Sequence, residues 1–402
     1  MPDAQLGTDA EVRARDGRPL LLCLSHLRWN FVFQRPQHLL TRAARDHDVV
    51  FFEEPVFKPG VPAPRLERHP VPEGVAVAVP VLPEAMAGDA AAVADAQRAM
   101  LDGLLAPEAG RRLIVWFYTP MALEFAGHLA PDVTVYDCMD ELSAFRGAPP
   151  GLLRLEQALL DRADLVFTGG RSLYEAKRDR HPRVFCFPSS IDAAHFGQAR
   201  ARRPDPADQA GVPRPRIGFF GVVDERMYLG LVRALAERRP DWRFVMIGPV
   251  AKIDPESLPR LPNLRWLGGK SYADLPAYLA GWDAGFMPFA LNESTRFISP
   301  TKTPEFLAAG LPVVSTPVLD VVRDYGEAGL VEIAEGPAAF ADALARVLSR
   351  PRTEWLEAVD RRIAEISWDR TWGEMRREVS GAAGRAPARA AGGSAPGMRE
   401  SA

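Results

Sequence analysis

Cysteine and long apolar runs are both scarce in this sequence. Its 402 residues include three cysteines, Cys23, Cys138 and Cys186, an odd number without the spacing of metal ligands. All three lie in apolar or strand-like segments, so we expect buried thiols in a reducing compartment. No apolar run approaches the roughly 18 residues of a membrane span, and the first residues lack the apolar core of a signal peptide. These absences predict a cytoplasmic protein.

A surplus of charge of either sign is absent as well. The chain has 49 Lys and Arg against 52 Asp and Glu, which gives a formal net charge of -3. This balance excludes a global positive field, so we expect no nucleic-acid partner. Hydrophobic residues at 47% and charged residues at 25% exclude a disordered, collagen-like or coiled-coil chain. At roughly 100 to 200 residues per domain, the length predicts two or three domains.

Strand-like and helix-like segments alternate along the chain. A first set of strands is predicted at residues 19–25, 49–55, 113–118, 134–138, 165–169 and 184–188, with helices near 36–45, 90–105, 150–162 and 171–180. A second set of strands is predicted at residues 216–221, 244–248, 264–268, 284–289, 312–316 and 330–334. Such alternation requires parallel strands joined by crossover helices. We therefore predict an α/β fold of two facing, Rossmann-like, doubly wound domains with a cleft between them.

Composition predicts the bounds of these domains. We expect loose tails at residues 1–18 and 381–402, domains at 19–197 and 216–366, a linker at 198–215 and a closing helix at 367–380. Trp368 and Trp372 of that helix are expected to pack on a domain. Ligands of parallel sheets bind outside the carboxyl ends of the strands. The loops at those ends are therefore the candidate sites.

The most informative segment spans residues 297–316. Thr303 is suited to cap a helix there, with Thr301 and Lys302 just before it. A helix amino terminus next to a lysine predicts an anion site. Lys302 would bind phosphate as a point charge, and Glu305 would accept hydrogen bonds from two ribose hydroxyls. In the structural alternative, Lys302 is solvated and Glu305 only offsets the helix dipole.

Four segments carry a resemblance to a known family. They are Lys302-Thr-Pro-Glu305-Phe-Leu-Ala-Ala-Gly310-Leu-Pro312, Ser189-Ser190-Ile191-Asp192 followed by Phe196, Gly218-Phe-Phe-Gly221, and Tyr272 to Tyr278 followed by Asp283. Together with the closing helix, they resemble the nucleotide-sugar glycosyltransferases of the two-lobed GT-B fold, particularly family 4. The resemblance covers most of the chain. It implies a GT-B fold whose second domain binds the donor and whose first domain faces the acceptor.

The resemblance also implies roles for residues of the donor domain. The matching lysine of the family binds the donor diphosphate and the matching glutamate binds the ribose, which assigns these roles to Lys302 and Glu305. Thr301 lies with them at the helix start. Arg226 is implied as a further diphosphate ligand, although a salt bridge with Asp224 or Glu225 is an equal alternative.

One departure from the family affects the donor sugar. Typical members have a glutamate eight residues before the second one, and this chain has Phe297 there. The nearest acid is Glu293. Asn292 and Glu293 are therefore the candidates for contacts with the donor sugar.

Polar and aromatic side chains gather in the loop after the first strand. His26, Arg28 and Trp29 lie in this loop, and Arg35 follows where a helix opens. Family members often have a glycine pair here, which this chain lacks. We predict that the cluster lines the acceptor side of the cleft. The alternative is that Trp29 packs beneath the loop.

Carboxylates end another strand of the first domain, in the run Asp137-Cys138-Met139-Asp140-Glu141. A carboxylate at this place accepts the proton of an acceptor hydroxyl, or binds sugar hydroxyls. Asp137 and Asp140 are joint catalytic candidates. A helix cap by Asp140 is the structural alternative.

We expect neither a metal nor a cofactor. Positive charge and aimed N–H groups can stabilise a departing nucleoside diphosphate without a metal. The literal Asp-x-Asp match, Asp46-His47-Asp48, lies between a helix and a strand, away from the cleft, and predicts a turn. The histidines lack the spacing of a zinc site. Motifs of nicotinamide enzymes, P-loop phosphotransferases and serine hydrolases are also missing.

Residues 171–216 contain ten Arg or Lys against five acids. This local excess would let the protein meet a phosphorylated or lipid-linked acceptor at the inner face of a membrane. A solvated helix and linker are the structural alternative.

These observations predict a transferase that moves a sugar from a nucleoside-diphosphate donor to a glycan or lipid-linked acceptor. The resemblance implies a role in envelope or exopolysaccharide synthesis and, because the family is mostly retaining, retention of the anomeric configuration. Two alternatives remain open. One is a sugar-nucleotide epimerase of the same fold, and the other is a non-catalytic sugar-nucleotide-binding partner of another enzyme.

Overall fold

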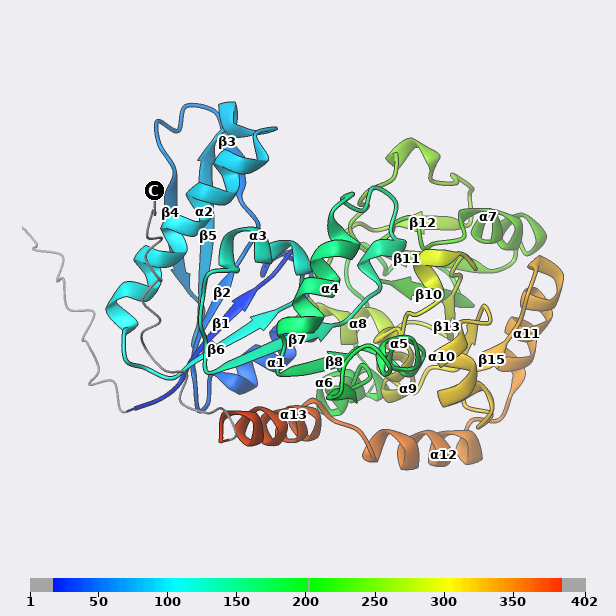
Figure 1. Cartoon of the computed structure of the whole chain (residues 1–402). Coiled ribbons are helices and arrows are strands. Elements are labelled where there is room, and N and C mark those ends of the chain that lie inside the picture. The colour runs from blue at the N-terminus through cyan, green and yellow to red at the C-terminus, as the bar shows by residue number, and fades with distance from the viewer. Residues whose placement is uncertain (1–16, 202, 385–402) are drawn as a thin grey trace, which may run out of the picture.

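The computed structural model describes residues 17–201 and 203–384 and contains two lobes, each built on one sheet (Figure 1). The predicted tails therefore fall almost entirely outside the described residues. The strands form where leucine, β-branched and aromatic residues cluster, because both faces of a parallel sheet are buried under helices. Every residue of the first strand, for example, is buried.

The first lobe has a nine-stranded sheet in the order β3-β5-β2-β1-β6-β7-β8-β9, with β4 paired antiparallel to β5 and all other pairs parallel. Its strands are β1 Leu20–Leu24, β2 Asp48–Phe52, β3 Val56–Lys58, β4 Arg65–Pro70, β5 Val75–Pro83, β6 Leu113–Phe117, β7 Val133–Cys138, β8 Leu165–Thr168 and β9 Val184–Cys186. Its helices are α1 Arg35–Ala43, α2 Ala90–Leu105, α3 Leu123–Ala126, α4 Leu152–Arg162 and α5 Arg171–Lys177.

The second lobe has a six-stranded parallel sheet in the order β12-β11-β10-β13-β14-β15. Its strands are β10 Arg216–Phe220, β11 Arg243–Ile247, β12 Leu264–Trp266, β13 Ala284–Met287, β14 Val313–Ser315 and β15 Glu332–Ile333. The helices of this half of the chain are α6 Ala193–Gly197, α7 Leu229–Arg238, α8 Leu275–Ala280, α9 Lys302–Ala308, α10 Leu319–Val321, α11 Pro337–Ser349, α12 Thr353–Ala364 and α13 Trp368–Ala383.

The predicted architecture of two doubly wound α/β lobes is confirmed, and each predicted strand is present. The strands β3, β4 and β5 were not predicted. β4 is charged and mostly exposed, and β5 contains Pro80, a residue that sequence patterns count against a strand. Tertiary pairing overrides that signal, because Pro80 stands opposite Leu66 on the edge of the sheet that β4 covers.

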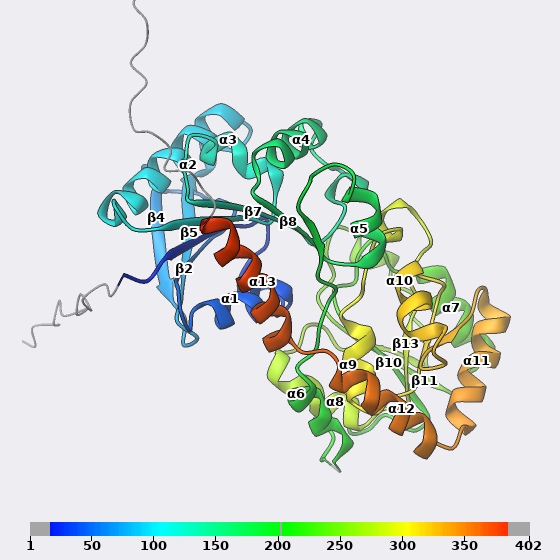
Figure 2. The same ribbon diagram turned by 60° about the horizontal axis from the view of Figure 1, so that its bottom comes forward.

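The chain crosses between the lobes twice. Ile191 and Phe196 already belong to the hydrophobic core of the second lobe, so that lobe begins before the linker predicted at 198–215. The helix α12 then leads back to α13, which lies beside α1 and beneath the first lobe (Figure 1, Figure 2). Trp368 and Trp372 of α13 lie in the core of the first lobe, as expected from the sequence. The closing helix thus belongs to the first lobe, although it follows the second in sequence.

Trp368 is the main anchor of this closing helix. It is 1% exposed, and its ring stacks on His38 of α1 at 4.7 Å between centroids. We predict that Trp368→Ala lowers the free energy of unfolding of the first lobe by about 3–5 kcal/mol, because it leaves a large cavity. Urea denaturation measures this loss. Arg370→Ala, on the exposed side of the same helix, is expected to change stability by about 0.5 kcal/mol or less, and an equal loss in both variants would contradict the anchor role.

Candidate active site

Two connected cavities lie at the carboxyl ends of the strands, between the lobes. The first, of about 180 Å³, lies where α9 begins and is called the helix-start cavity; Lys302, Glu305, Gly221 and Arg226 line it. The second, of about 460 Å³, is called the cleft cavity and is lined by both lobes, with His26 among its residues. The two share Asp140 and Arg226. The strand order reverses between β10 and β13 beside the first cavity, which is where ligands of such sheets bind.

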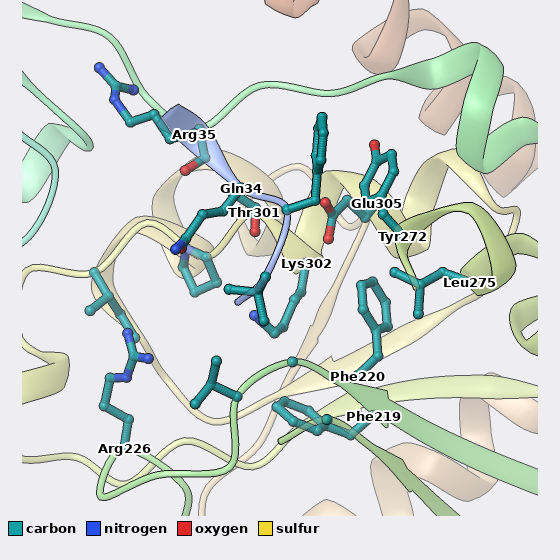
Figure 3. Close-up of a pocket in the computed structure, with 18 of the residues that line it drawn as sticks. Gln34, Arg35, Phe219, Phe220, Arg226, Tyr272, Leu275, Thr301, Lys302 and Glu305 are labelled. Carbon is teal, nitrogen blue, oxygen red and sulfur yellow. The ribbon is translucent and has the colours of Figure 1, made fainter. Parts of the chain in front are cut away.

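The side chain of Lys302 reaches from α9 over the end of β10 (Figure 3). This path is open only because residue 221 is a glycine, since a Cβ there would lie 1.8 Å from Lys302 Cε. Gly221 has a φ of 134°, a conformation that L side chains rarely adopt. Gly248, at the end of β11, is needed for the same reason, because its Cβ would lie 1.8 Å from the Gly221 carbonyl oxygen.

The helix start differs in detail from the sequence prediction. α9 begins at Lys302, and Thr301 occupies the N-cap position without a side-chain cap. The prediction that Thr303 caps the helix is wrong. Thr303 is fully buried inside the first turn, and its hydroxyl donates to the sulfur of Met287 at 3.5 Å. Thr303 therefore packs against β13 and does not cap the helix.

Lys302 and Glu305 face the helix-start cavity, where Lys302 lies 6.0 Å from the centroid of the Phe219 ring. Among the residues that the structure describes, neither side chain forms a hydrogen bond or an ion pair, although Glu305 is only 7% exposed. Burial lowers the pKa of Lys302, and burial raises the pKa of Glu305 to about 7, an effect that Lys302 opposes. An unpaired cation and an unpaired carboxylate in one enclosed space are costly without a ligand.

Arg226 lines both cavities, but it is not free. Its guanidinium donates to Asp224, with Nη2 at 2.6 Å from Oδ2 and Nε at 3.0 Å from Oδ1. The salt bridge that the sequence left as an alternative is therefore present. Glu225 instead accepts from the backbone N–H of Arg146, across the cleft, at 2.9 Å. The pair of Arg226 and Asp224 still leaves the guanidinium at the cavity wall (Figure 3).

The structure separates the two catalytic candidates. Asp140 lines both cavities, and burial raises its pKa, with Asp224 adding to the effect. Asp137 is fully buried and lines neither cavity; Arg35 binds it through Nη2 at 2.8 Å and through Nε at 3.1 Å to both carboxylate oxygens. Arg35 also donates to the Phe187 carbonyl at 2.7 Å. This pair fastens α1 to β7 and so positions the cavity wall.

Some residues of the loop after β1 line the cleft cavity, and one packs in the hydrophobic core. His26 and Arg28 line the cleft cavity. Burial lowers the pKa of His26 to about 4, so the imidazole is neutral at pH 7, and its Nδ1 has no partner among the described residues. Arg28 is held by Glu53 at 3.1 Å. Trp29 packs against Phe51 in the core, which is the structural alternative considered for it.

The residues named for the donor sugar lie apart from the cavities. Asn292 caps a short 3-10 turn, and Glu293 forms an exposed ion pair with Arg296 at 3.6 Å. Neither lines the helix-start or the cleft cavity. Phe297 packs against the hydrophobic core of the first lobe, so this position joins the lobes.

Several lining residues were not predicted. Gln34, Lys270 and Tyr272 line the helix-start cavity, and Tyr272 stacks on Phe33 of the first lobe at 4.5 Å. Tyr272 belongs to one of the segments that carry the family resemblance, which gave it no role in the site. Its position at a helix start after β12 was the available signal. The sequence around Gln34 did not indicate a site residue, because Gln34 reaches the cavity only through the placement of the two lobes opposite each other.

The basic segment 171–216 is largely neutralised within the protein. Its ion pairs join Lys177 to Glu141 and Glu156, Arg180 to Glu156, Arg183 to Glu378, Arg200 to Asp360, Arg214 to Asp283 and Arg216 to Asp205. Arg202 lies outside the described residues.

In residues 17–201 and 203–384, no helix is long and apolar enough to cross a membrane, and no group of three His, Cys, Asp or Glu could hold a metal. His47 pairs with Asp46 at 2.7 Å in the turn before β2.

The burial of Glu305 predicts a pH-dependent change in stability. Its pKa is about 7 in the folded protein against an ordinary 4.5, so the folded state keeps a proton that the unfolded state releases in this interval. Stability therefore falls as pH rises from 4.5 to 7, by about 3 kcal/mol at most. We expect Glu305→Gln to raise the melting temperature at pH 8 and to leave it nearly unchanged at pH 4.5. Thermal unfolding at both values measures this, and equal shifts at both would contradict it.

Comparisons with known proteins agree with this arrangement. Residues 214–350 match the family described as Glycosyl transferases group 1. TuaH of Bacillus subtilis (strain 168), provisionally assigned as a teichuronic acid biosynthesis glycosyltransferase, is 27% identical over 284 residues, which cover 66% of this chain and 71% of TuaH.

Two solved structures are similar over both lobes. An E. coli structure, described as trehalose-6-phosphate bound with UDP-2-fluoro glucose, has a TM-score of 0.66 at 15% identity and covers 90% of this chain and 98% of its own. The sucrose-phosphate synthase of Thermosynechococcus elongatus has the same TM-score and identity and covers 91% of this chain and 100% of its own. These likenesses show the fold. The two lobes therefore have the GT-B fold, and the second lobe, over residues 214–350, matches glycosyltransferase group 1.

Proposed function

We propose that this glycosyltransferase takes a sugar from a nucleoside-diphosphate sugar and transfers it to a glycan or lipid-linked acceptor. The observation that carries the proposal is the unpaired Lys302 and Glu305 in the enclosed helix-start cavity. A nucleoside diphosphate supplies what each of them lacks, namely anionic oxygens for the ammonium and a pair of ribose hydroxyls for the carboxylate. The E. coli structure of similar fold is described with a UDP sugar, which supports this ligand class.

The departing diphosphate needs positive charge as its bond to the sugar breaks. Lys302 and Arg226 both face the helix-start cavity, and Asp224 orients the guanidinium of Arg226 through two bonds. Fixed cations of this kind stabilise developing negative charge without reorganisation during the reaction. We propose that these side chains provide the stabilisation, so that catalysis needs no metal.

The acceptor enters through the cleft cavity. Asp140 stands where this cavity joins the helix-start cavity, so its carboxylate lies between donor and acceptor. We propose that Asp140 binds a hydroxyl at the reaction centre, while the neutral His26 offers an uncharged nitrogen to the acceptor. Members of this family are typically retaining, and we propose retention here as well. The likeness to TuaH supports an acceptor in cell-envelope polysaccharide synthesis.

The donor site is tested by thermal shift with UDP, GDP, ADP, CMP and dTDP. We expect one of these nucleotides to raise the melting temperature of the wild type, since a ligand at 100 times its Kd adds roughly 2.7 kcal/mol. Lys302→Ala should lose this shift. Lys58→Ala, which removes an exposed lysine far from the cavity, should keep it. An undiminished shift in Lys302→Ala would remove this lysine from the site.

The role of Asp140 is tested by kinetics on the donor and acceptor pair. Asp140→Asn keeps the shape of the side chain and removes its charge, so we expect kcat to fall about 100-fold or more, roughly the effect of losing one charged group at a reaction centre. The Kd of the nucleotide should change by less than about threefold. An unchanged kcat would exclude Asp140 from the reaction, and interconversion of donors without an acceptor would indicate an epimerase.

A further inference from the structure

A third cavity continues the acceptor side of the site into the first lobe. It has a volume of about 400 Å³ and lies between the end of β2, the first half of α2 and α3; we call it the distal cavity. Glu54, Thr119 and Met121 line both the distal and the cleft cavity, so the two adjoin. Its size lies within the range of roughly 300–1,000 Å³ that small-molecule sites occupy.

Gln97 of α2 offers a polar group without a protein partner in the wall of this cavity. It is 6% exposed, and its side-chain amide has no hydrogen-bond partner among the described residues. The amide atoms are accessible from the cavity, since they are not among the buried side-chain atoms that lack a partner in the described residues, so a ligand in the cavity can reach them. Because the amide both donates and accepts hydrogen bonds, it matches a hydroxyl group well.

The remaining walls of the distal cavity combine aromatic faces with hydrogen-bond acceptors. Phe57 and Phe125 supply the aromatic surface. Glu54 and Glu124 line the cavity with carboxylates that form no ion pair with a described residue, whereas the Glu53 carboxylate is occupied by the Trp29 N–H at 2.7 Å and by Arg28. Among residues 17–201 and 203–384, no lysine, arginine or histidine lines the cavity. An anionic ligand would therefore meet repulsion there, whereas hydroxyl groups would find acceptors.

Resting on the proposed function, we propose that the distal cavity is a second acceptor subsite, which binds a neutral sugar unit one position away from the unit that receives the transferred sugar. The reacting unit lies in the cleft cavity beside Asp140, and Glu54 stands at the junction between the two units. Gln97 binds a hydroxyl of the distal unit, and Phe57 and Phe125 contact its apolar C–H face. The enzyme thus prefers an acceptor of at least two sugars.

An apolar chain would fit these walls less well than a sugar does. A lipid tail would bury the Gln97 amide without a partner and would cover the Glu54 carboxylate, which is exposed to solvent. A sugar ring satisfies both groups while its C–H face rests on an aromatic ring. The test therefore includes an alkyl glycoside as the competing ligand.

The subsite is tested by saturation-transfer NMR on the full chain with the nucleoside diphosphate that the thermal shift identifies. The probes are maltose, cellobiose, lactose and chitobiose, their constituent monosaccharides, and octyl glucoside. We expect at least one disaccharide to bind about tenfold or more tightly than its monosaccharide. Gln97→Leu should reduce this advantage by about fivefold or more, and Ala94→Trp, which fills the cavity from α2, should abolish it. Asp95→Ala, on the exposed side of α2, should preserve it.

The nucleotide shift serves as the control in each variant. A wild type without any nucleotide shift would refute the proposed function, whereas an intact shift in Gln97→Leu and Ala94→Trp shows that these variants are folded and hold the donor. With that shift intact, the subsite is overturned if no disaccharide binds better than its monosaccharide, or if the advantage survives in Ala94→Trp. It is also overturned if octyl glucoside binds better than every disaccharide and Gln97→Leu leaves its binding unchanged, because the cavity would then hold an apolar chain.

Discussion

The site depends on the enclosure of an unpaired lysine against the end of a strand. Lys302 can occupy this place because Gly221 has no side chain, and Gly248 in turn lets the end of β11 approach the backbone of Gly221 closely. Glu305, one turn along the same helix, is buried with it, and its pKa of about 7 reflects the cost of that burial. The fold keeps both charges without a partner because packing around the strand ends is strong enough to bear this cost.

Both lobes contribute residues to the walls of the site. Contacts across the cleft hold the lobes in their relative position. The Ser172 N–H donates to Asp320 at 3.0 Å, and the Ser189 hydroxyl donates to the Ser299 carbonyl at 2.9 Å. The Phe145 ring lies 5.5 Å from Arg226 and 5.4 Å from Lys252. These contacts bring Asp140 of one lobe to the two cations of the other. Three adjoining cavities result, which extend from the start of α9 to the first half of α2.

Buried ion pairs of the first lobe stabilise the elements that carry the lining residues. Arg35 and Asp137 hold α1 against β7, and Lys177 lies 2.6 Å from both Glu141 and Glu156, behind the loop that carries Asp140. Breaking such a pair leaves an uncompensated charge and costs roughly 3–5 kcal/mol. Asp137 therefore resembles a catalytic carboxylate in the sequence, because it ends a strand next to Asp140, but its partner gives it a structural role.

The sequence alone determined the alternation of strands and helices and the existence of two lobes, and it made Lys302 and Glu305 candidates for the site, because hydrophobic periodicity and helix-start chemistry are local properties. It did not predict the strands β3 to β5, because Pro80 in β5 and the charged residues of β4 interrupt the hydrophobic pattern of a strand. Only the tertiary structure decided that Asp140 reaches the cavity while Asp137, Asn292 and Glu293 do not, and that Gln97 is left without a partner. The physical reason is that the surroundings of a side chain are set by residues far away in sequence, here on the facing lobe and on neighbouring strands.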